Sequence, residues 1–282
     1  MSDKLSTSRI LAITSGKGGV GKTFVSANLA AALAKRGRRV LVLDADLGLA
    51  NLDIMLKLYP KTTLHDVLTG TSTLAETVLK APGGFSVLPA ASGLVEYSRL
   101  TRDVQHEMQQ IIDSLSCQYD YLILDTGAGI SDIVLYTASL ASEVLVVATP
   151  DPTALADAYA TIKVLAQMQK RTSVHLVFNQ VRSAVEGRKL AEQLQLVVDR
   201  FINTQPGIIV KLNYLGEIPT DVAVSNAIRR RQLLFVSTPE APSALAIAAL
   251  AAVLDAPAKT PFSATDRRVN APHSSVASTR TH

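Results

Sequence analysis

A glycine-rich segment, SGKGGVGKT at residues 15–23, constrains this chain more than any other feature of its sequence. An apolar run, residues 10–14, precedes it, and a helical pattern rich in leucine and alanine follows it. The segment satisfies G-x-x-x-x-G-K-[ST] in the order of strand, loop and helix that this pattern requires. Such glycines let backbone N–H groups turn inward around phosphate oxygens, and a helix N-terminus adds a favourable dipole. The sequence therefore predicts a phosphate-binding loop, and the alternative is a glycine-rich structural turn.

The predicted loop assigns roles to the side chains that can reach a nucleotide. We expect Lys22 to contact the β- and γ-phosphates and to contribute to catalysis, and we expect the Thr23 hydroxyl to bind Mg²⁺. The predicted cofactors are therefore ATP and Mg²⁺. The nucleotide-binding residues predicted in the loop are Gly16, Lys17, Gly18, Gly19, Val20, Gly21, Lys22 and Thr23.

Acidic side chains end two further apolar runs of the chain. Asp44 and Asp46 follow one run, and Asp125 follows another. Ligands of open α/β sheets lie at the carboxyl ends of strands, so these acids should lie beside the phosphate loop. We expect Asp125 and Asp46 to join Thr23 in holding Mg²⁺, Asp46 to position the attacking water, and Asp44 to support the loop or the outer shell of the metal. Asp is also common in turns, so the alternative is that these acids only cap strand ends.

The same kind of apolar run recurs along the chain and predicts the fold. Continuous apolar strands are buried on both faces, which is typical of a parallel sheet. One-sided helical patterns at residues 104–115 and 190–201 lie between such runs. The alternation predicts an α/β fold with a doubly wound, mostly parallel sheet of the P-loop NTPase class. The predicted strands are residues 10–14, 40–43, 85–88, 121–124, 144–148 and 174–178.

The end of the chain has a different composition. An alanine-rich apolar helix is predicted over residues 241–255. The residues after it are rich in Ser, Thr, Pro and Arg and show no periodicity, so we expect them to be disordered. The predicted organisation is therefore one P-loop ATPase domain at residues 1–256 and a disordered tail at residues 257–282.

Composition and charge exclude several classes of protein. A net charge of +4 over 282 residues is too small to indicate nucleic-acid binding by itself. The single cysteine, Cys117, excludes an intramolecular disulfide and a cysteine-based metal cluster, and its apolar neighbours predict a packed thiol. The sequence shows neither a secretory segment nor an apolar run long enough to span a bilayer. We therefore expect a cytoplasmic protein, with a peripheral position at the inner face of the membrane as the alternative.

Five segments resemble a known family. The loop GKGGVGKT is similar to the deviant Walker A motif of the MinD/ParA ATPases. LDADLGLANLDIML at residues 43–56 and DTGAGI at residues 125–130 resemble the two switch segments of these proteins. VLPAASG at residues 87–93 and DPTALADAYATIKVL at residues 151–165 look like the FlhG/FleN branch, the MinD-like regulators of flagellar number.

The resemblance implies further site residues and one departure. In this family an early lysine of the loop reaches across a dimer to the nucleotide of the partner, and Lys17 matches it, so Lys17 is expected to be catalytic. An asparagine after a late strand reads adenine in the family, and Asn179 matches it; Pro219 and Asp221 match the loop that closes over the base. Phe24 departs from the pattern, because many relatives have a Ser or Thr there that can bond the α-phosphate.

The resemblance also implies a function. It indicates an ATP-dependent homodimer, a slow ATPase stimulated by dimerisation, which regulates flagellar number or placement through a flagellar transcription activator, a flagellar SRP-type GTPase or both. Direct contact with nucleic acid is not expected. Membrane contact should be weak or absent, because residues 257–282 show no apolar stripe. Two alternatives stay open: a ParA-type partitioning ATPase that binds DNA nonspecifically, and a non-hydrolysing module that binds ATP as a structural ligand.

Overall fold

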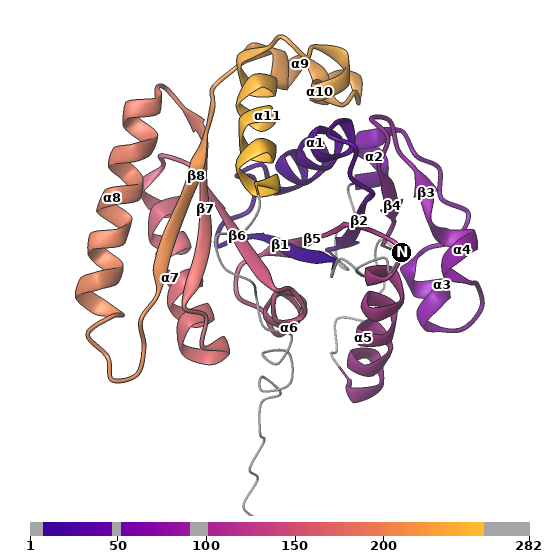
Figure 1. The fold of residues 1–282 in the computed structure, drawn as a ribbon, viewed down its shortest axis with the longest axis horizontal. Helices are drawn as coiled ribbons and strands as arrows, with labels where there is room; N and C mark the ends of the chain where they lie inside the picture. The colour runs from indigo at the N-terminus through magenta and orange to yellow at the C-terminus, as the bar shows by residue number, and fades with distance from the viewer. Residues whose placement is uncertain (1–7, 47–51, 91–100, 257–282) are drawn as a thin grey trace, which may run out of the picture.

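Eight strands form a single sheet at the centre of the molecule (Figure 1). The computed structural model describes residues 8–46, 52–90 and 101–256, so the predicted tail lies outside the described residues. The strand order is β3-β4-β2-β5-β1-β6-β7-β8, and only the β3–β4 pair is antiparallel. The predicted doubly wound, mostly parallel α/β fold is confirmed. The strands are β1 (Arg9–Ser15), β2 (Val40–Ala45), β3 (Leu79–Lys80), β4 (Ser86–Leu88), β5 (Tyr121–Ala128), β6 (Glu143–Ala148), β7 (Ser173–Val181) and β8 (Lys211–Pro219).

Helices cover both faces of the sheet (Figure 1). Helices α1, α2, α10 and α11 contribute to the core on one face, and α3, α5, α6, α7 and α8 contribute to the core on the other. Among the helices that the structure describes, none is long and apolar enough to cross a membrane. The helices are α1 (Lys22–Lys35), α2 (Leu52–Leu56), α3 (Leu64–Leu68), α4 (Leu74–Thr77), α5 (Arg102–Ser116), α6 (Asp132–Leu140), α7 (Pro152–Gln169), α8 (Ala184–Phe201), α9 (Val222–Arg230), α10 (Leu234–Ser237) and α11 (Pro242–Asp255).

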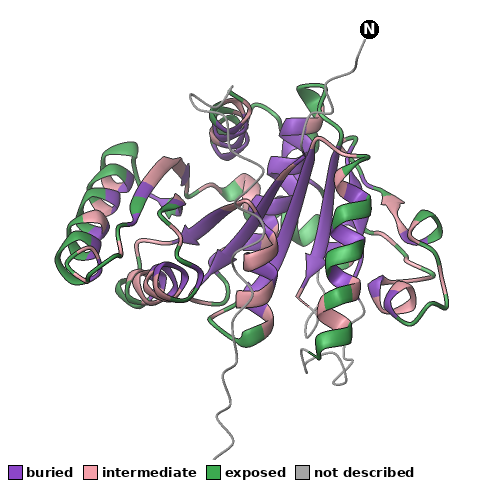
Figure 2. Ribbon diagram, turned by 60° about the horizontal axis from the view of Figure 1, so that its bottom comes forward, coloured by how far each residue is buried: buried purple, intermediate pink, exposed green. Residues whose placement is uncertain are grey.

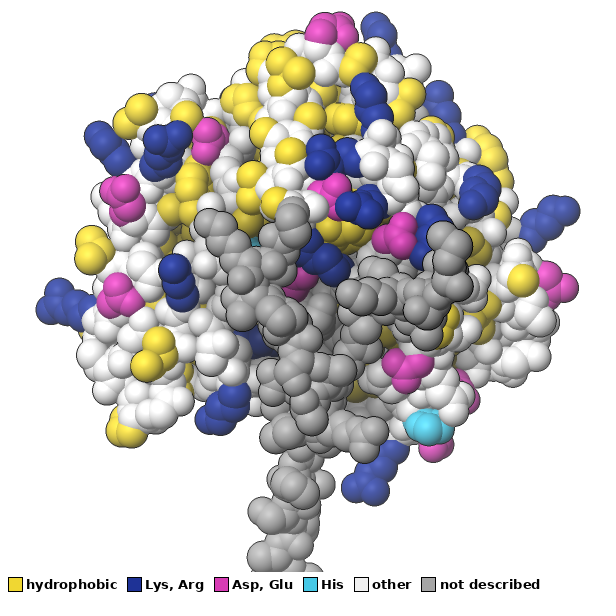
Figure 3. Space-filling model, viewed as in Figure 1, with side chains coloured by type: hydrophobic (Ala, Val, Ile, Leu, Met, Phe, Trp, Pro, Cys, Tyr) yellow, Lys and Arg dark blue, Asp and Glu magenta, His cyan; other side chains and the backbone are white. Residues whose placement is uncertain are grey.

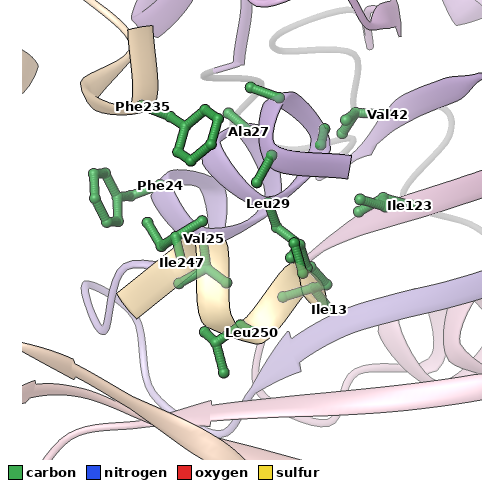
Figure 4. Close-up of a cluster of buried hydrophobic side chains, with 14 of the residues drawn as sticks. Ile13, Phe24, Val25, Ala27, Leu29, Val42, Ile123, Phe235, Ile247 and Leu250 are labelled. Carbon is green, nitrogen blue, oxygen red and sulfur yellow. The ribbon is translucent and has the colours of Figure 1, made fainter. Parts of the chain in front are cut away.

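The central strands are buried on both faces, as their continuous apolar sequences predict (Figure 2). Successive side chains of a strand point to opposite faces, so each strand supplies both cores. In β2, Val40 and Val42 pack on the side of α1, and Leu41 and Leu43 pack on the other side. Phe24 is buried in the first core, among side chains from α10 and α11 (Figure 4). The Phe that departs from the family pattern is therefore a core residue that joins three helices.

The structure adds two strands that the sequence patterns did not predict. β3 is only two residues long, and β8 is an edge strand whose residues are mostly half-buried. An edge strand contacts the sheet on one side only, so its sequence, KLNYLGEIP, lacks a continuous apolar run.

Two expectations about packing were wrong. Val197 and Phe201 on α8 are 38% and 53% exposed, because this helix packs near the edge of the sheet and leaves part of its apolar pattern in solvent. Cys117 is exposed, because it is the C-cap residue of α5 and lies beyond Leu115, the last buried position of that helix.

The strand order places the carboxyl ends of β1, β2 and β5 side by side. Ile13 of β1 is in register with Asp125 of β5, and Asp125 is in register with Asp44 of β2. The loop that follows β1 therefore lies at the same end of the strands as Asp125 of its neighbour β5 and Asp44 of β2, the next strand beyond β5.

An ion-pair network connects β1, β6 and β7 near the amino ends of these strands, at the opposite end from the phosphate loop. Arg9 donates to both carboxylate oxygens of Glu143, at 2.8 and 2.7 Å, and Nε2 of His175 lies 2.9 Å from Oε2. Arg9 also donates to the hydroxyl of Tyr121 at 3.0 Å. Burial acts to raise the pKa of Glu143, but the hydrogen bonds from His175 and Arg9 outweigh it and hold the pKa at about 2.

Glu143→Gln should destabilise the protein. The folded-state pKa of Glu143, about 2, lies below its ordinary value of 4.5, so the ionised group contributes stability above pH 4.5 that is lost as the pH falls toward 2. We expect the variant to lose about 3 kcal/mol of unfolding free energy at pH 7. Urea unfolding at several pH values between 7 and 3.5 measures it. Glu240→Gln, an exposed control, should unfold like the wild type. A difference between Glu143→Gln and wild type that does not narrow below pH 4.5 would contradict the assignment.

Candidate nucleotide-binding site

The phosphate loop takes its shape from its glycines. Gly16 lies against α7, since a Cβ at this position would be 2.2 Å from the carbonyl oxygen of Asp157. Gly19 and Gly21 have φ values of +78° and +96°, which side chains with a Cβ rarely adopt. Gly21 is the N-cap of α1, and within the described residues no side chain caps this helix end. The first N–H groups of α1 therefore point out of the helix as donors for an anion.

Lys22 begins α1 and is buried between acidic groups. The residue is only 9% exposed. Burial lowers the pKa of Lys22, and the negative charges of Asp125 and Asp46 act against this change. The structure thus brings together the lysine and two of the acids that the sequence assigned to one site.

Asp125 is buried at the carboxyl end of β5, where hydroxyl groups from α1 reach it. The Oγ of Ser26 donates to Oδ1 of Asp125 at 2.8 Å, and the Thr23 side chain is hydrogen-bonded to the same carboxylate. Burial raises the pKa of Asp125, while these hydrogen bonds and the charge of Lys22 lower it in part. Asp125 therefore connects the first turn of α1 to the centre of the sheet.

Asp44 is a second buried carboxylate next to Asp125. Burial and the negative charge of Asp125 raise the pKa of Asp44. Its oxygens accept from the backbone N–H groups of Asp46 at 3.2 Å and of Leu52 at 3.3 Å. Asp44 therefore connects the end of β2 to the start of α2, which fits its predicted supporting role.

The oxygens of this site fit a hard divalent cation. Mg²⁺ prefers oxygen ligands and is usually held by one or two carboxylates together with phosphate oxygens and water. Thr23 and Asp125 offer such oxygens, and a cation would offset the free-energy cost of burying ionised carboxylates next to each other. Across residues 8–46, 52–90 and 101–256, no group of three or more His, Cys, Asp or Glu side chains could hold a metal by itself. The residues therefore fit Mg²⁺ shared with a nucleotide, and its assignment to Thr23, Asp46 and Asp125 stays a prediction.

Asp46 belongs to the first predicted switch segment and lies close to the second. It is the last described residue after β2, and a Cβ at Gly127 would be 3.4 Å from its Oδ1. Its charge also acts on Lys22. Asp46 is thus beside both the phosphate loop and the second switch, where an attacking water would have to be oriented, and its catalytic role stays a prediction.

Lys17 contacts the N-terminus of α7 in the same chain. Its Nζ lies 3.2 Å from Oδ1 of Asp151 and 2.6 Å from Oγ1 of Thr153. Asp151 is the N-cap of α7, and hydrogen bonds from Thr153 and from the backbone of Ala154, with Lys17, hold the pKa of Asp151 well below its usual range. The side chains of Lys17 and Asp151 are 42% and 50% exposed. Lys17 is therefore a solvent-accessible cation that the loop presents at its outer side.

The predicted base contacts lie at the carboxyl ends of β7 and β8. The amide Nδ2 of Asn179 donates to the carbonyl oxygen of Val20 at 2.8 Å, and its Oδ1 accepts from the N–H of Gln180. Asn179 therefore supports the phosphate loop in this structure, and a Cβ at Gly21 would collide with it at 2.4 Å. Its contact with adenine stays a prediction.

Pro219 and Asp221 form a joint between β8, α9 and α11. Asp221 caps α9 by accepting from the N–H of Ala223 at 2.8 Å. Ser243 of α11 donates its hydroxyl to the carbonyl oxygen of Pro219 at 3.0 Å and its N–H to Asp221 at 3.2 Å. This position at the end of β8 is compatible with the predicted role of Pro219 and Asp221 in closing over the nucleotide base. That role stays a prediction.

Two contributors to the site were missed by sequence reasoning. Ser26 supports Asp125, and its spacing of four residues from Lys22 puts it one helical turn further along the same face of α1. Asp151 holds Lys17, and its position before Pro152 is a helix N-cap signal. Neither sequence pattern predicts the contact itself, because Asp125 and Lys17, the residues that Ser26 and Asp151 contact, are distant from them in the sequence.

This arrangement defines a class of protein. A mostly parallel sheet with a glycine-rich loop after its strand β1, a helix end that can bind an anion, and acids at the ends of β5 and β2 on one side of β1 is the architecture of a P-loop nucleotide-binding protein.

The chain belongs to the CobQ/CobB/MinD/ParA nucleotide-binding domain family, which its residues 11–234 match. It is 42% identical over 247 residues to the antiactivator FleN of Pseudomonas aeruginosa, covering 88% of this chain and 86% of FleN. It is 34% identical over 236 residues to the flagellum site-determining protein YlxH of Helicobacter pylori, covering 82% of this chain and 76% of YlxH. The predicted resemblance is confirmed.

The fold is also shared with solved structures of the family. The septum site-determining protein MinD of Pyrococcus horikoshii, solved with Mg-ADP, superposes with a TM-score of 0.73 at 26% identity, over 88% of this chain and 96% of MinD. Membership of a nucleotide-binding family and this Mg-nucleotide complex agree with the predicted cofactors, ATP and Mg²⁺.

Lys22→Ala should strongly weaken the binding of ATP. Removing the ammonium group takes away a charged donor to the β- and γ-phosphates, and we expect affinity to fall by about 100-fold or more. Titration with a fluorescent ATP analogue measures it, and circular dichroism checks that the variant is folded. Lys189→Ala, an exposed lysine on α8, is the control and should bind normally. Near-native affinity in a folded Lys22→Ala protein would remove Lys22 from the phosphate site.

Proposed function

We propose that this protein is an ATP-dependent dimerising switch that hydrolyses ATP and regulates flagellar number or placement through partner proteins. The observation that carries the proposal is the pair of lysines in one phosphate loop: Lys22 is buried among acids, and Lys17 is exposed at the outer side of the loop. Similarity to FleN and YlxH over most of the chain supports the flagellar role.

The proposed reaction is the attack of water on the γ-phosphate of ATP, which gives ADP and phosphate. Phosphoryl transfer of this kind needs positioning and charge stabilisation more than covalent chemistry. Backbone N–H groups of the loop and Lys22 bind the phosphates, and Asp46 orients the water. Mg²⁺, when bound, neutralises charge on the phosphate oxygens, and Thr23 and Asp125 are the residues that would hold it, directly or through water.

Lys17 is proposed to act in the active site of a second protomer. Its contacts with Asp151 and Thr153 are solvent-exposed, and exposed ion pairs of this kind contribute little to stability. Lys17 can therefore leave α7 at small cost when a second copy faces the loop. The homodimer and the slow, dimer-stimulated rate follow from this assignment.

The proposed output is a change of partner binding between the ATP-bound dimer and the free monomer. A flagellar transcription activator, an SRP-type flagellar GTPase or both are the partners that this role implies; the name antiactivator for FleN supports the first. We propose a cytoplasmic protein with weak or absent membrane contact, and one ATPase domain at residues 1–256 followed by a tail at residues 257–282.

The two alternative functions predict different measurable properties. A ParA-type DNA-binding ATPase would need a basic surface, and the exposed residues Arg229, Arg230 and Arg231 at the end of α9 are the strongest basic run. Its DNA affinity would fall steeply with salt. A non-hydrolysing module would bind ATP and show no single turnover.

Asp46→Ala should trap the ATP-bound state. The acid orients water and does not grip the nucleotide, so binding should persist while hydrolysis falls by about 100-fold or more. Phosphate release measures turnover, and size-exclusion chromatography with ATP should show a larger dimer fraction than in the wild type. Asp53→Ala, which changes an acid in the first turn of α2, is the control and should turn over normally. Unchanged turnover in Asp46→Ala would leave Asp46 as a loop residue only.

Hydrolysis should depend on protein concentration, because Lys17 acts across the dimer. A cation supplied in trans stabilises charge on the transferring phosphoryl group, so Lys17→Ala should lose about 10-fold or more in rate and should stay monomeric with ATP. Asp151→Ala is the matched control, since it removes the contact within the chain and leaves Lys17 in place. Specific activity measured over a wide dilution range tests both. A flat profile, together with normal hydrolysis by Lys17→Ala, would show that the enzyme works as a monomer.

A further inference from the structure

A groove lies away from the nucleotide site, between the end of α2, the β3–β4 turn and the start of α10. Its volume is about 700 Å³, which is in the range of pockets that bind ligands. Much of its lining is apolar, from Leu58, Ala81, Pro82, Leu233 and Val236. Val236 is 52% exposed, so an occupant could remove apolar surface from water there.

Basic side chains surround this apolar lining. Lys57, Lys80 and Arg231 line the groove and are exposed, and no Asp or Glu of the described ranges is among the lining residues. Within the part of the chain that the structure describes, none of these three cations has an ion-pair partner. Figure 3 shows basic and apolar side chains close together over the upper part of this face, where α9 to α11 lie.

The backbone of the groove is closely packed. Gly83 has a φ of +93°, and a Cβ there would lie 2.8 Å from the Cβ of Ala31 and 2.9 Å from a methyl of Leu233. The β3–β4 turn next to the groove therefore packs closely against α1 and the start of α10. Lys57 and Arg231 have φ values of 53° and 50°, a conformation that costs free energy for residues other than glycine. Basic side chains thus occupy two positions where glycine would be less strained.

The groove is connected to the nucleotide site through two elements. Helix α2 begins at Leu52, whose N–H donates to Asp44, and it ends at the groove, where the N–H of Leu58 donates to the carbonyl oxygen of Asp53 at 2.9 Å. On the other wall, the N–H of Phe235 in α10 donates to Oδ1 of Asn28 in α1 at 2.9 Å. The groove and the nucleotide site therefore share α1 and α2 as supporting elements.

We propose that this groove docks a short segment of a partner protein that combines apolar side chains with carboxylates. The apolar lining favours a peptide over a nucleic-acid backbone, which presents phosphates and needs no apolar floor. The unpaired cations complement carboxylates and select against basic segments. The inference rests on the proposed function in that the protein acts by binding partners, and it adds the surface and the chemistry of what binds.

A selection for peptides tests the proposal. A library of random short peptides displayed on phage is selected on the full-length protein, and enriched sequences are synthesised and measured by fluorescence anisotropy. We expect enriched peptides to carry Asp or Glu beside Leu, Ile or Phe, and to bind the double variant Lys57→Glu/Arg231→Glu about 10-fold more weakly or worse. The matched control is Lys61→Glu/Arg230→Glu, which reverses two exposed charges close by that do not line the groove.

A second pair of variants tests the apolar part. Val236→Ser should weaken the same peptides, whereas Val253→Ser on α11 should not, although both valines are 52% exposed. Enriched peptides without acids, or equal binding to wild type and to the groove variants, would overturn the proposal. The proposal would also be overturned if Lys57→Glu/Arg231→Glu no longer bound duplex DNA or phosphatidylglycerol vesicles but still bound the peptides with unchanged affinity. Equal peptide affinity with ADP and with a non-hydrolysable ATP analogue would overturn the connection to the nucleotide site.

The proposal of a docking groove and the proposal of an ATPase switch can be contradicted by separate results. ATP hydrolysis measured on the groove variants should match the wild type, since none of the substituted residues lies at the phosphate loop. A protein that hydrolyses ATP but yields no groove-dependent peptide contradicts the groove alone. A protein that binds such peptides but performs no turnover contradicts the proposed ATPase switch alone.

Discussion

The structure depends on a small set of charges buried at the carboxyl edge of the sheet. Lys22 lies among Asp125 and Asp46, and Asp44 is adjacent to Asp125. Buried charges are costly unless they are paired and hydrogen-bonded. Burial raises the pKa of Asp44 to about 8 and that of Asp125 to about 6, which reduces the negative charge that these two acids carry. A cation bound beside them would favour their ionised forms and would offset the charge of a phosphate.

The elements around these charges hold the phosphate loop in its shape before a nucleotide enters. Gly16 packs against the backbone of α7, and Asn179 of β7 donates to the carbonyl oxygen of Val20. The loop is thus held from two sides by elements that follow it by more than a hundred residues. Preorganisation of this kind limits the entropy that is lost on binding. The loop also contacts α7 at a second point, where Asp151 holds Lys17.

Many of the expected features came from local patterns. The motif of residues 15–23 located the phosphate loop, and the acids at strand ends located Asp44, Asp46 and Asp125. The structure places these residues at the same end of the sheet, because a buried parallel strand is apolar along its whole length and its end can be recognised in the sequence. β8 and the outer side of α8 were predicted poorly. Both lie at an edge of the sheet, where one-sided packing weakens the link between an apolar pattern and burial.

The amino-acid sequence by itself determined the fold class, the family, and the glycine-rich loop and the acids of the candidate site, because these depend on residue types at fixed local spacing. Only the tertiary structure decided which distant groups meet. It placed Ser26 on Asp125, Asn179 on Val20 and Lys17 on Asp151. It also assembled the groove from Lys57, Lys80 and Arg231, which are far apart in the chain. No local pattern encodes such pairs, because strand order and helix packing set the distances between them.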